Sequence, residues 1–347
     1  MKPSRRSSRR SSVPAVERTL RVAVCGCGVW ARQHVRNLLA LPGVDLVALV
    51  DDNHAAAARL RDEELVPKGR PCSLFHSLDE QLRLAPVDAV VIATPHHLHY
   101  PQARAALEAG AHVLVEKPMT TSTRHARELI RLAKRARRVL AIGYQGACTD
   151  ELAYARKLIA RGALGEIRSI NAFLCRPWLG NCRGTWRLRK SEAGGGILYD
   201  SGCHVLHAIM WLTALKPVEV FADVDNRDEE VDVVSSLLIR FANGAAATVL
   251  VDGDARPYAE GMRIMGSRGT VATSAYGGRL EHYQDFELLK YPPVVNRDVT
   301  VQSNFVDAIR GEAEVVSPGE WGLALCRVMD AVYLSARTGK PVKVRDR

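Results

Sequence analysis

The stretch LRVAVCGCGVWA, residues 20–31, is an apolar run that ends in a glycine-rich turn. A short apolar run that stops at a glycine is typical of a buried strand, and a helical pattern follows in ARQHVRNLLAL. In this G-x-G-x-x-A pattern, Gly26 permits the tight turn, Gly28 lets the backbone approach a pyrophosphate, and Ala31 keeps the helix close to the sheet. The stretch therefore predicts the strand, turn and helix of a dinucleotide-binding fold.

An acidic pair indicates which dinucleotide is bound. The next apolar run, VDLVALV, ends in Asp51 and Asp52, about 20 residues beyond the glycine turn. A carboxylate there accepts hydrogen bonds from the adenine ribose and repels the additional phosphate of NADP, and Asp51 follows the strand immediately. Val29 and Trp30, which open the helix, are expected beside the phosphates. A solvated helix cap is the alternative explanation of the pair, but the pattern predicts NAD(H) in preference to NADP(H).

Strand and helix patterns alternate over residues 20–145. Near-continuous apolar strands separated by helices of this length indicate a parallel sheet that is covered on both faces. We therefore predict a doubly wound α/β (Rossmann) domain for this part of the chain. The expected strands are 20–26, 44–52, 87–95, 111–116 and 138–145, and the expected helices are 31–41, 54–65, 101–110 and 120–137.

The pattern changes after residue 150, where one helix precedes several segments of period-two alternation. Asn243-Gly244 between two of these segments is typical of a hairpin turn. We predict that residues 146–347 form an α+β domain with a large, open, mainly antiparallel sheet and an amphipathic helix at 321–338. The expected strands are 167–174, 218–224, 233–241, 245–253, 262–273 and 279–284.

The composition is that of a soluble globular protein, with 47% apolar and 25% charged residues. No apolar run approaches the roughly 18 residues that cross a membrane. The eight cysteines show no regular spacing, so no zinc site is expected. In the absence of a secretory signal we expect reduced thiols, a cytoplasmic location and no membrane partner.

Half of the net charge of +10 lies in the first residues, MKPSRRSSRRSS, which contain no acid. Such a segment can be a nucleic-acid arm, a transit peptide or a twin-arginine export signal. An export signal requires an apolar segment after the arginines, which VPAVERTLRV does not supply. We therefore expect residues 1–19 to form a disordered, solvated tail with no nucleic-acid partner.

Charged residues stand at the end of an apolar strand in VLVEKPMTTS, residues 113–122. Burying a lysine is costly and proline ends a strand, so Glu116-Lys117-Pro118 at this point indicates a function. With this tripeptide, the chain resembles the Gfo/Idh/MocA family of sugar and polyol oxidoreductases from residue 20 onward. The other motifs that carry the resemblance are Ala93-Thr94-Pro95 with His99, Trp186-Arg187, and GGGILYDSGCH from Gly194 to His204.

The resemblance implies cofactor contacts beyond the glycine turn. Thr94-Pro95 and His99 would line the nicotinamide ribose, with Glu116 near the same ribose. Gln145 lies where relatives touch the cofactor or the substrate. Many relatives continue with an arginine, whereas Gly146-Ala147-Cys148 follows here. This departure leaves the substrate contacts of the loop open.

The resemblance also implies a catalytic group at Lys117, which binds cofactor and substrate alike. Its ammonium would hydrogen-bond a substrate hydroxyl and stabilise negative charge on that oxygen. A cis Lys–Pro bond, as in relatives, would aim it at the reacting carbon. Burial beside other cations is expected to lower the pKa of Lys117 and ease proton exchange.

Asp200 and His204 are four residues apart, so they would share one face of a helix. His204 would take the hydroxyl proton while the carbon yields hydride, and Asp200 would orient the sugar. The three glycines before them would let the backbone approach a ligand. Trp186 and Arg187 would form a wall of the sugar site, because an aromatic face and a forked donor suit a polyol.

These features predict an NAD-dependent oxidoreductase that transfers hydride between nicotinamide and a secondary alcohol or ketone of a cyclic sugar, inositol or related polyol. Relatives imply a homodimer or homotetramer formed through the C-terminal sheet. The alternatives are a non-catalytic dinucleotide-binding sensor or repressor, which would not need all three catalytic candidates, and a glycoside hydrolase that uses NAD transiently. A metal enzyme built from His96, His97, His99 and His204 is disfavoured, because hydride transfer needs no metal.

Overall fold

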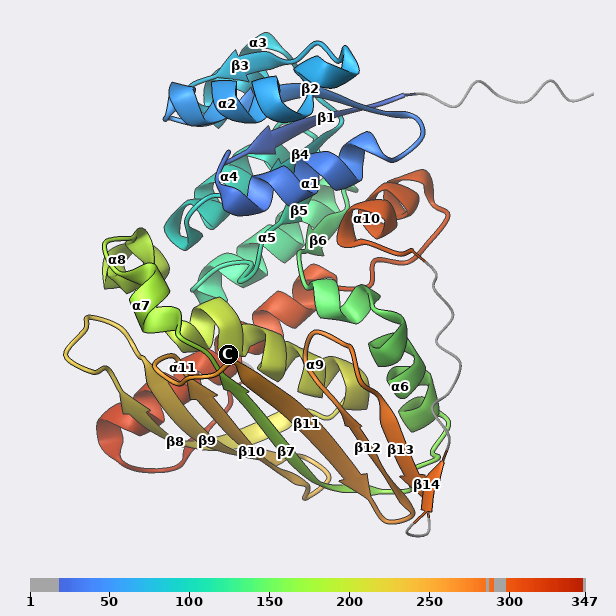
Figure 1. The fold of residues 1–347 in the computed structure, drawn as a ribbon, viewed down its shortest axis with the longest axis vertical. Coiled ribbons are helices and arrows are strands. Elements are labelled where there is room, and N and C mark those ends of the chain that lie inside the picture. Colours follow the sequence, from blue (N-terminus) through green and yellow to red (C-terminus); the bar gives the residue numbers. More distant parts are fainter. Residues whose placement is uncertain (1–18, 285–286, 290–297, 346–347) are drawn as a thin grey trace, which may run out of the picture.

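The computed structural model describes residues 19–284, 287–289 and 298–345. The predicted basic tail, 1–19, therefore lies outside the described residues except for Thr19. Figure 1 shows two sheets stacked along the long axis of the molecule, with helices around the first sheet and between the two.

The first sheet has six strands in the order β3-β2-β1-β4-β5-β6. Every neighbouring pair is parallel, so the predicted doubly wound sheet is confirmed. The order reverses between β1 and β4, which is the switch point where such sheets bind ligands. The strands are β1 (Leu20–Cys25), β2 (Val44–Val50), β3 (Ser73–Phe75), β4 (Ala89–Ile92), β5 (His112–Val115) and β6 (Leu140–Ile142).

Helices cover both faces of this sheet (Figure 1). They are α1 (Val29–Leu39), α2 (His54–Glu64), α3 (Leu78–Leu84), α4 (His96–Glu108) and α5 (Thr123–Ala136). The predicted start of α4 at Pro101 is wrong, because Pro101 lies inside this helix and Pro95 caps it. Burial of His96 and His99 against the protein accounts for the earlier start. The histidines at 96, 97 and 99 therefore lie on a helix and not in a loop.

The second sheet has nine strands in the order β14-β13-β12-β11-β7-β10-β9-β8-β15. Its pairs are antiparallel except for β7 with β10, which is parallel, so the predicted mainly antiparallel sheet is confirmed. Gly244 has a φ of 89°, which suits the Asn243-Gly244 hairpin turn between β9 and β10. The strands are β7 (Ile167–Cys175), β8 (Pro217–Asp225), β9 (Val234–Phe241), β10 (Ala246–Asp252), β11 (Ala259–Gly266), β12 (Gly269–Thr273), β13 (Glu281–Gln284), β14 (Glu287–Leu289) and β15 (Val342–Lys343).

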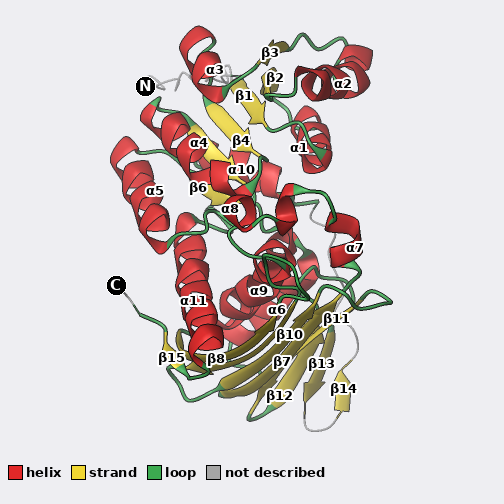
Figure 2. Cartoon of the chain, turned by 90° about the vertical axis from the view of Figure 1, so that its left-hand side faces the viewer, coloured by secondary structure: helices red, strands yellow, loops and turns green. Residues whose placement is uncertain are grey.

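One face of the second sheet is covered and the other is open (Figure 2). The covering helices are α6 (Asp150–Ala160), α9 (Cys203–Thr213) and α11 (Gly319–Thr338). Residues of β9 and β10 alternate between buried and exposed, as expected for a sheet with one solvated face. The expected strand at 262–273 is two strands, β11 and β12, which pair as a hairpin.

Helix α10 (Val301–Arg310) returns to the first half of the chain and packs against α1. Its Phe305 and Val306 are buried in the apolar cluster that contains Val22 and Leu38. Figure 1 shows α10 beside α1 and β6, far from the second sheet. The division of the chain at residues 145 and 146 remains a prediction, and α10 is a late segment that packs within the early layer.

Candidate active site

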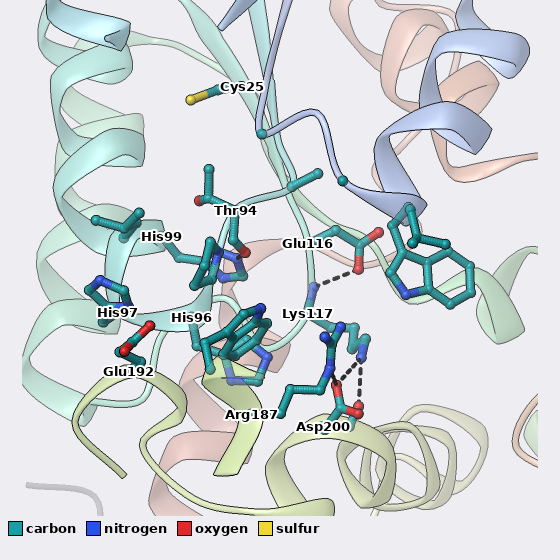
Figure 3. Close-up of a pocket in the computed structure, with 18 of the residues that line it drawn as sticks. Cys25, Thr94, His96, His97, His99, Glu116, Lys117, Arg187, Glu192 and Asp200 are labelled. Atoms are coloured by element: carbon teal, nitrogen blue, oxygen red, sulfur yellow. Dashed lines mark hydrogen bonds and ion pairs between the residues drawn. The ribbon is translucent and has the colours of Figure 1, made fainter. Parts of the chain in front are cut away.

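One cavity of about 1190 Å³ receives side chains from both halves of the chain. Its first end lies at the carboxyl ends of β1, β2 and β4, the edge at which doubly wound sheets bind ligands. Its second end is formed by residues after β7, by the turn before α9 and by tyrosines that flank β11 and β12. Figure 3 shows side chains of α4, β5 and the turn before α9 converging on this cavity.

The glycine turn forms a cradle at the first end. Gly26 has a φ of 89°, and a Cβ there would lie 2.6 Å from the Ala93 carbonyl oxygen, so glycine is required. At Gly28 no heavy atom lies within 4 Å of an added Cβ, so its backbone faces open space in the cavity. Val29 and Trp30, 91% and 49% exposed, line the cavity at the amino end of α1. This cradle fits the pyrophosphate of a dinucleotide, which also gains from the helix amino terminus.

Asp51 lies beside the cradle. Its Oδ2 accepts from the Cys27 N–H at 2.6 Å and its Oδ1 from the Asn53 N–H at 2.8 Å. Asp52 also lines the cavity. The remaining wall of this end of the cavity consists of His76, Ser77, Leu78 and Asp79. The sequence analysis missed this wall, because the strand before it, β3, has only three residues and gives almost no periodic signal.

The turn after β4 is joined to the turn after β5 by His99. Its Nδ1 lies 2.7 Å from the Pro118 carbonyl oxygen and its Nε2 lies 2.9 Å from that of Thr94. Thr94, Pro95 and His99 all line the cavity, and the Thr94 hydroxyl also bonds Gln102 at 2.6 Å. Their contact with the nicotinamide ribose remains a prediction. The polar atoms of His99 are thus directed at the protein backbone.

Glu116 is held by a chain of hydrogen bonds that the sequence analysis missed. Its Oε1 lies 2.9 Å from His34 Nε2, and His34 Nδ1 lies 2.6 Å from the Gln302 side-chain nitrogen. Because the Gln302 amide donates to Nδ1, the His34 proton is on Nε2 and donates to Glu116. Burial raises the pKa of Glu116, but His34 and Lys117 outweigh burial and hold this pKa below its ordinary value. Glu116 is therefore an anchored carboxylate.

Lys117 reaches the second half of the chain. Its Nζ donates to the Asp200 backbone oxygen at 2.6 Å and lies 3.3 Å from Asp200 Oδ1 (Figure 3). The Lys117–Pro118 bond is cis, as the resemblance implies. The predicted lowering of the Lys117 pKa is wrong. Burial does lower it, but the charges of Asp200 and Glu116 outweigh burial and the pKa is raised, so this ammonium is a stable cation.

Asp200 contacts three other residues of the site through its carboxylate. It lies on a π-helical turn, η4 (Leu198–Gly202), and not on the α-helix expected from its spacing to His204. Its Oδ2 accepts from Trp178 Nε1 at 2.7 Å, and its Oδ1 lies 3.5 Å from Arg187 Nε. Burial raises its pKa, yet Lys117 and Arg187 outweigh burial and hold that pKa well below the ordinary value. Asp200 is therefore ionised.

His204 lies one turn further on, in the first turn of α9. Its ring is 5.7 Å from that of Tyr144 and 4.7 Å from that of Tyr276, and it lines the cavity. Burial, with a smaller contribution from Lys117, lowers its pKa well below the ordinary value, so the imidazole is neutral. His207 instead stacks on Tyr144 with ring centres 3.9 Å apart, which is a packing role.

The triple glycine, Gly194 to Gly196, packs against buried protein groups, whereas it was expected to approach a ligand. An added Cβ at Gly196 would lie 1.8 Å from the Asp232 carbonyl oxygen, and one at Gly195 would lie 2.2 Å from the Tyr333 hydroxyl. Asp232 also accepts from the Gly196 N–H at 2.6 Å and from the Leu198 N–H at 2.8 Å. These glycines therefore allow close packing on buried protein groups and not on a ligand.

Trp186 and Arg187 form one wall of the second end of the cavity. The Trp186 ring meets that of His96 edge-on at 4.6 Å, and the Arg187 guanidinium lies 4.6 Å above the Trp186 ring centre. Gln145 also lines the cavity. At Gly146 an added Cβ would lie 2.1 Å from the Ala275 carbonyl oxygen, so the backbone there leaves no room for the arginine that relatives carry.

The structure adds residues to the second end of the cavity that no motif indicates. They lie after β7 or beside β11 and β12, where single aromatic and basic residues give no spacing signal: Arg176, Trp178, Asn181, Tyr258 and Tyr276. Their position at the carboxyl end of a strand is the signal that could have found Arg176 and Trp178, which directly follow β7.

Within the described residues, no group of three or more His, Cys, Asp or Glu side chains is arranged to hold a metal ion. The rings of His96 and His99 are directed at carbonyl oxygens of Ala193, Pro118 and Thr94. No helix in the same residues has both the length and the apolar composition that a bilayer crossing requires.

Comparison with known proteins identifies relatives of both halves. An oxidoreductase family model with an NAD-binding Rossmann fold matches residues 20–144, and the GFO/IDH/MocA C-terminal domain matches 152–272. The chain is 30% identical to dTDP-3,4-didehydro-2,6-dideoxy-alpha-D-glucose 3-reductase of Streptomyces violaceoruber over 258 residues, 73% of this chain and 72% of the relative.

A second relative is aligned over a shorter part. The chain is 30% identical over 237 residues to 1-carboxy-3-chloro-3,4-dihydroxycyclo hexa-1,5-diene dehydrogenase of Comamonas testosteroni, covering 67% of this chain but only 58% of the relative. Among solved structures, GenD2 from gentamicin A biosynthesis in complex with NAD is 28% identical, with a TM-score of 0.81 over 97% of this chain and 99% of that one. The two domain matches and the long alignments show that the chain belongs to the Gfo/Idh/MocA family of oxidoreductases.

Proposed function

We propose that the protein is an NAD-dependent dehydrogenase or reductase that acts on a secondary alcohol or ketone of a cyclic sugar, inositol or related polyol. The contact between Lys117 and Asp200 carries this proposal, because it joins a cation to a carboxylate in the cavity that the neutral His204 also lines. That contact lies between the glycine cradle and the aromatic wall of Trp186. A hydroxyl-bearing ring can therefore reach the site from one side and a nicotinamide from the other.

The protein's own groups supply the proton transfer. Lys117 donates a hydrogen bond to the substrate oxygen and stabilises its negative charge. His204, neutral and buried, accepts the hydroxyl proton during oxidation and returns it during reduction. Asp200 holds Lys117 in place and accepts from a neighbouring hydroxyl of the ring. The dinucleotide supplies the hydride acceptor or donor.

The first end of the cavity supports NAD(H) over NADP(H). Asp51, Asp52 and Asp79 line it, and a carboxylate beside the adenine ribose accepts its hydroxyls and repels a 2′-phosphate. The arginine and lysine side chains that line the described cavity are Arg176, Arg187 and Lys117. All three lie at or near the catalytic point, so none is placed to bind that phosphate.

We further propose a homodimer or homotetramer formed through the open face of the second sheet. Phe173, Phe221, Leu238 and Leu250 project from this face and are between 36% and 42% exposed. Phe221 is paired with Leu238, and Leu250 with Phe173. The two pairs are offset by two residues between β9 and β10, and together they form an apolar row across β8, β9, β10 and β7. An exposed apolar row of this kind is typical of an interface.

The activity is tested by mixing the protein with NAD and a panel of inositols, aldoses and glycosides and following NADH absorbance. We expect NADH formation with at least one cyclic polyol and tighter binding of NADH than of NADPH in a fluorescence titration. Tight NADH binding without turnover on any alcohol would favour a sensor. Release of free sugar from a glycoside without net NADH would identify a hydrolase.

A further inference from the structure

The second end of the cavity carries more positive than negative charge. Lys117, Arg176 and Arg187 line it, and Asp200 is the carboxylate that faces them. Asp200 already contacts Lys117 and Arg187 (Figure 3). The other two carboxylates that line the cavity near this point have partners of their own, since Glu116 bonds His34 and Glu192 bonds Arg189. The third cation, Arg176, forms no ion pair with any of these carboxylates.

Arg176 forms no ion pair with a carboxylate of the described residues. Glu260 on β11 interacts with Arg176 electrostatically but forms no ion pair with it, and accepts from the Ser274 hydroxyl at 2.7 Å. The Arg176 guanidinium is half-buried, and its contact is the hydroxyl of Ser201, 3.4 Å away. The guanidinium of Arg176 therefore contacts the residue that directly follows Asp200 in the sequence.

The backbone holds Arg176 in a defined position. Its N–H donates to the Asp252 carbonyl at 2.9 Å, and its carbonyl accepts from the Trp178 N–H at 2.8 Å. The Trp178 side chain is in turn bonded to Asp200. The guanidinium is thus mounted on a rigid strand end that is tied to the catalytic carboxylate, as a binding group must be to discriminate between ligands.

The surrounding segment is basic as well. Residues 176–190, RPWLGNCRGTWRLRK, contain no aspartate or glutamate. Their basic residues are Arg176, Arg183, Arg187, Arg189 and Lys190. A cleft lined by one sign of charge raises the local concentration of ligands of the opposite sign. Tyr258 and Tyr276 add neutral hydroxyl donors beside it.

From this cation we propose that the substrate carries an anionic group, a carboxylate or a phosphate on the sugar or polyol ring, and that Arg176 binds that group beside Ser201. A guanidinium presents two parallel N–H donors to either anion, which also orients the ring. The inference rests on the proposed function, and it specifies the substrate class of the same site.

The test compares matched neutral and anionic sugars on the protein saturated with NADH. Glucose, glucuronate and glucose 6-phosphate form one series, and galactose, galacturonate and galactose 6-phosphate form another. Binding is followed by the change in NADH fluorescence. We expect at least one acid or phosphate to bind about 10- to 100-fold more tightly than its parent sugar, which is the range for a charge-assisted hydrogen bond. The series also shows which anion is preferred.

Two variants assign the preference to Arg176. Arg176→Gln should remove most of this preference, because the affinity for the anionic sugar falls much more than the affinity for its parent. Arg168→Gln, an exposed arginine near the other end of β7 that does not line the cavity, should leave it intact. A series in which no anion binds more tightly than its parent, or a preference that survives in Arg176→Gln, overturns the inference. Turnover of a neutral polyol in that case would leave the proposed function standing.

Discussion

Lys117 and Asp200, 83 residues apart in the sequence, meet across the junction of the two halves, where Lys117 Nζ donates to the Asp200 backbone oxygen at 2.6 Å. The contact joins the end of β5 to the turn before α9. The cation therefore comes from one half of the chain and the carboxylate that holds it comes from the other.

Replacing Lys117 by Met should abolish most of the turnover. Met fills a similar volume but cannot donate to the substrate oxygen, so kcat/KM should fall about 100- to 10,000-fold. NADH binding, measured by fluorescence, should be nearly unchanged because the glycine cradle and Asp51 are intact. Full activity of Lys117→Met would refute the assigned mechanism.

Replacing Asp51 by Asn should weaken NADH binding roughly 10-fold or more, because one charged acceptor for the ribose hydroxyls is lost. NADPH binding should improve, since the repulsion of its phosphate is reduced. Asp62→Asn, an exposed acid on α2, is the matched control and should change neither affinity. An unchanged NADH affinity in Asp51→Asn would move the ribose contact to Asp52 or Asp79.

His34 should act through Glu116 as a positioning residue. His34→Phe removes the side-chain donor of the Glu116 carboxylate and leaves it only the Lys117 backbone N–H, so the free energy of unfolding should fall by about 1–3 kcal/mol. Without His34 the pKa of Glu116 rises, and NADH affinity should become pH-dependent as this carboxyl titrates.

Gln302→Leu tests the next link of the same chain. This variant keeps His34 as the donor to Glu116 but removes the hydrogen bond that sets the His34 tautomer. The losses of stability and of NADH affinity should therefore be in the same direction as in His34→Phe, but smaller. Equal effects of His34→Phe and Gln302→Leu, or a flat pH profile in the first, would show that His34 merely packs.

Two buried histidines should make the protein sensitive to acid. Burial lowers the pKa of His96 and of His207 from 6.5 to about 3. Below pH 6.5 the unfolded chain binds protons that the folded chain does not, so the free energy of unfolding falls as pH falls. Each histidine contributes a slope of about 1.4 kcal/mol per pH unit until its folded pKa is reached.

The measurement is urea unfolding from about pH 7 to about pH 5. His207→Gln should be less stable than the wild type at neutral pH, because it loses the stacking on Tyr144. Its free energy of unfolding should change less steeply with pH, because the contribution of one histidine to the slope is lost. His54→Gln, which replaces an exposed histidine on α2, is the matched control. Parallel slopes for His207→Gln and the wild type would contradict this account.

The apolar row on the open sheet face should hold copies of the chain together. The double variant Phe221→Glu, Leu238→Glu places two charges in paired positions of β8 and β9. We expect it to sediment or elute as a smaller species than the wild type by light scattering. Leu84→Glu, at a leucine 62% exposed on α3, should keep the wild-type mass. A monomeric wild type would exclude the interface.

The fold was predictable because its signals are local. The glycine turn, the apolar strands of the first half and the alternating strands of the second half each depend on short-range periodicity. The motif residues Glu116, Lys117, Asp200 and His204 line one cavity, although their roles remain predictions. Predictions that depended on long-range contacts failed, because nothing near Lys117 in sequence shows that Asp200 raises its pKa.

Other omissions have the same cause. Asp232 accepts a hydrogen bond from Gly196, and Gln302 bonds and orients His34. Each of these partners is far from the other in the sequence. Arg176 has no motif around it, and its importance depends on which carboxylates are already paired. The three-residue strand β3 is too short for any periodic pattern, so the wall it positions was missed.

Helix α10 has a consequence for how the protein is made. Phe305 is fully buried in the core that contains Val22 and Leu38, and removing a buried phenylalanine costs about 3–5 kcal/mol. A nascent chain reaches this residue only after the whole second sheet except its two-residue edge strand has been synthesised. The nucleotide-binding layer is therefore completed only after nearly all of the second sheet has been synthesised, and we expect the cofactor to be acquired no earlier than that.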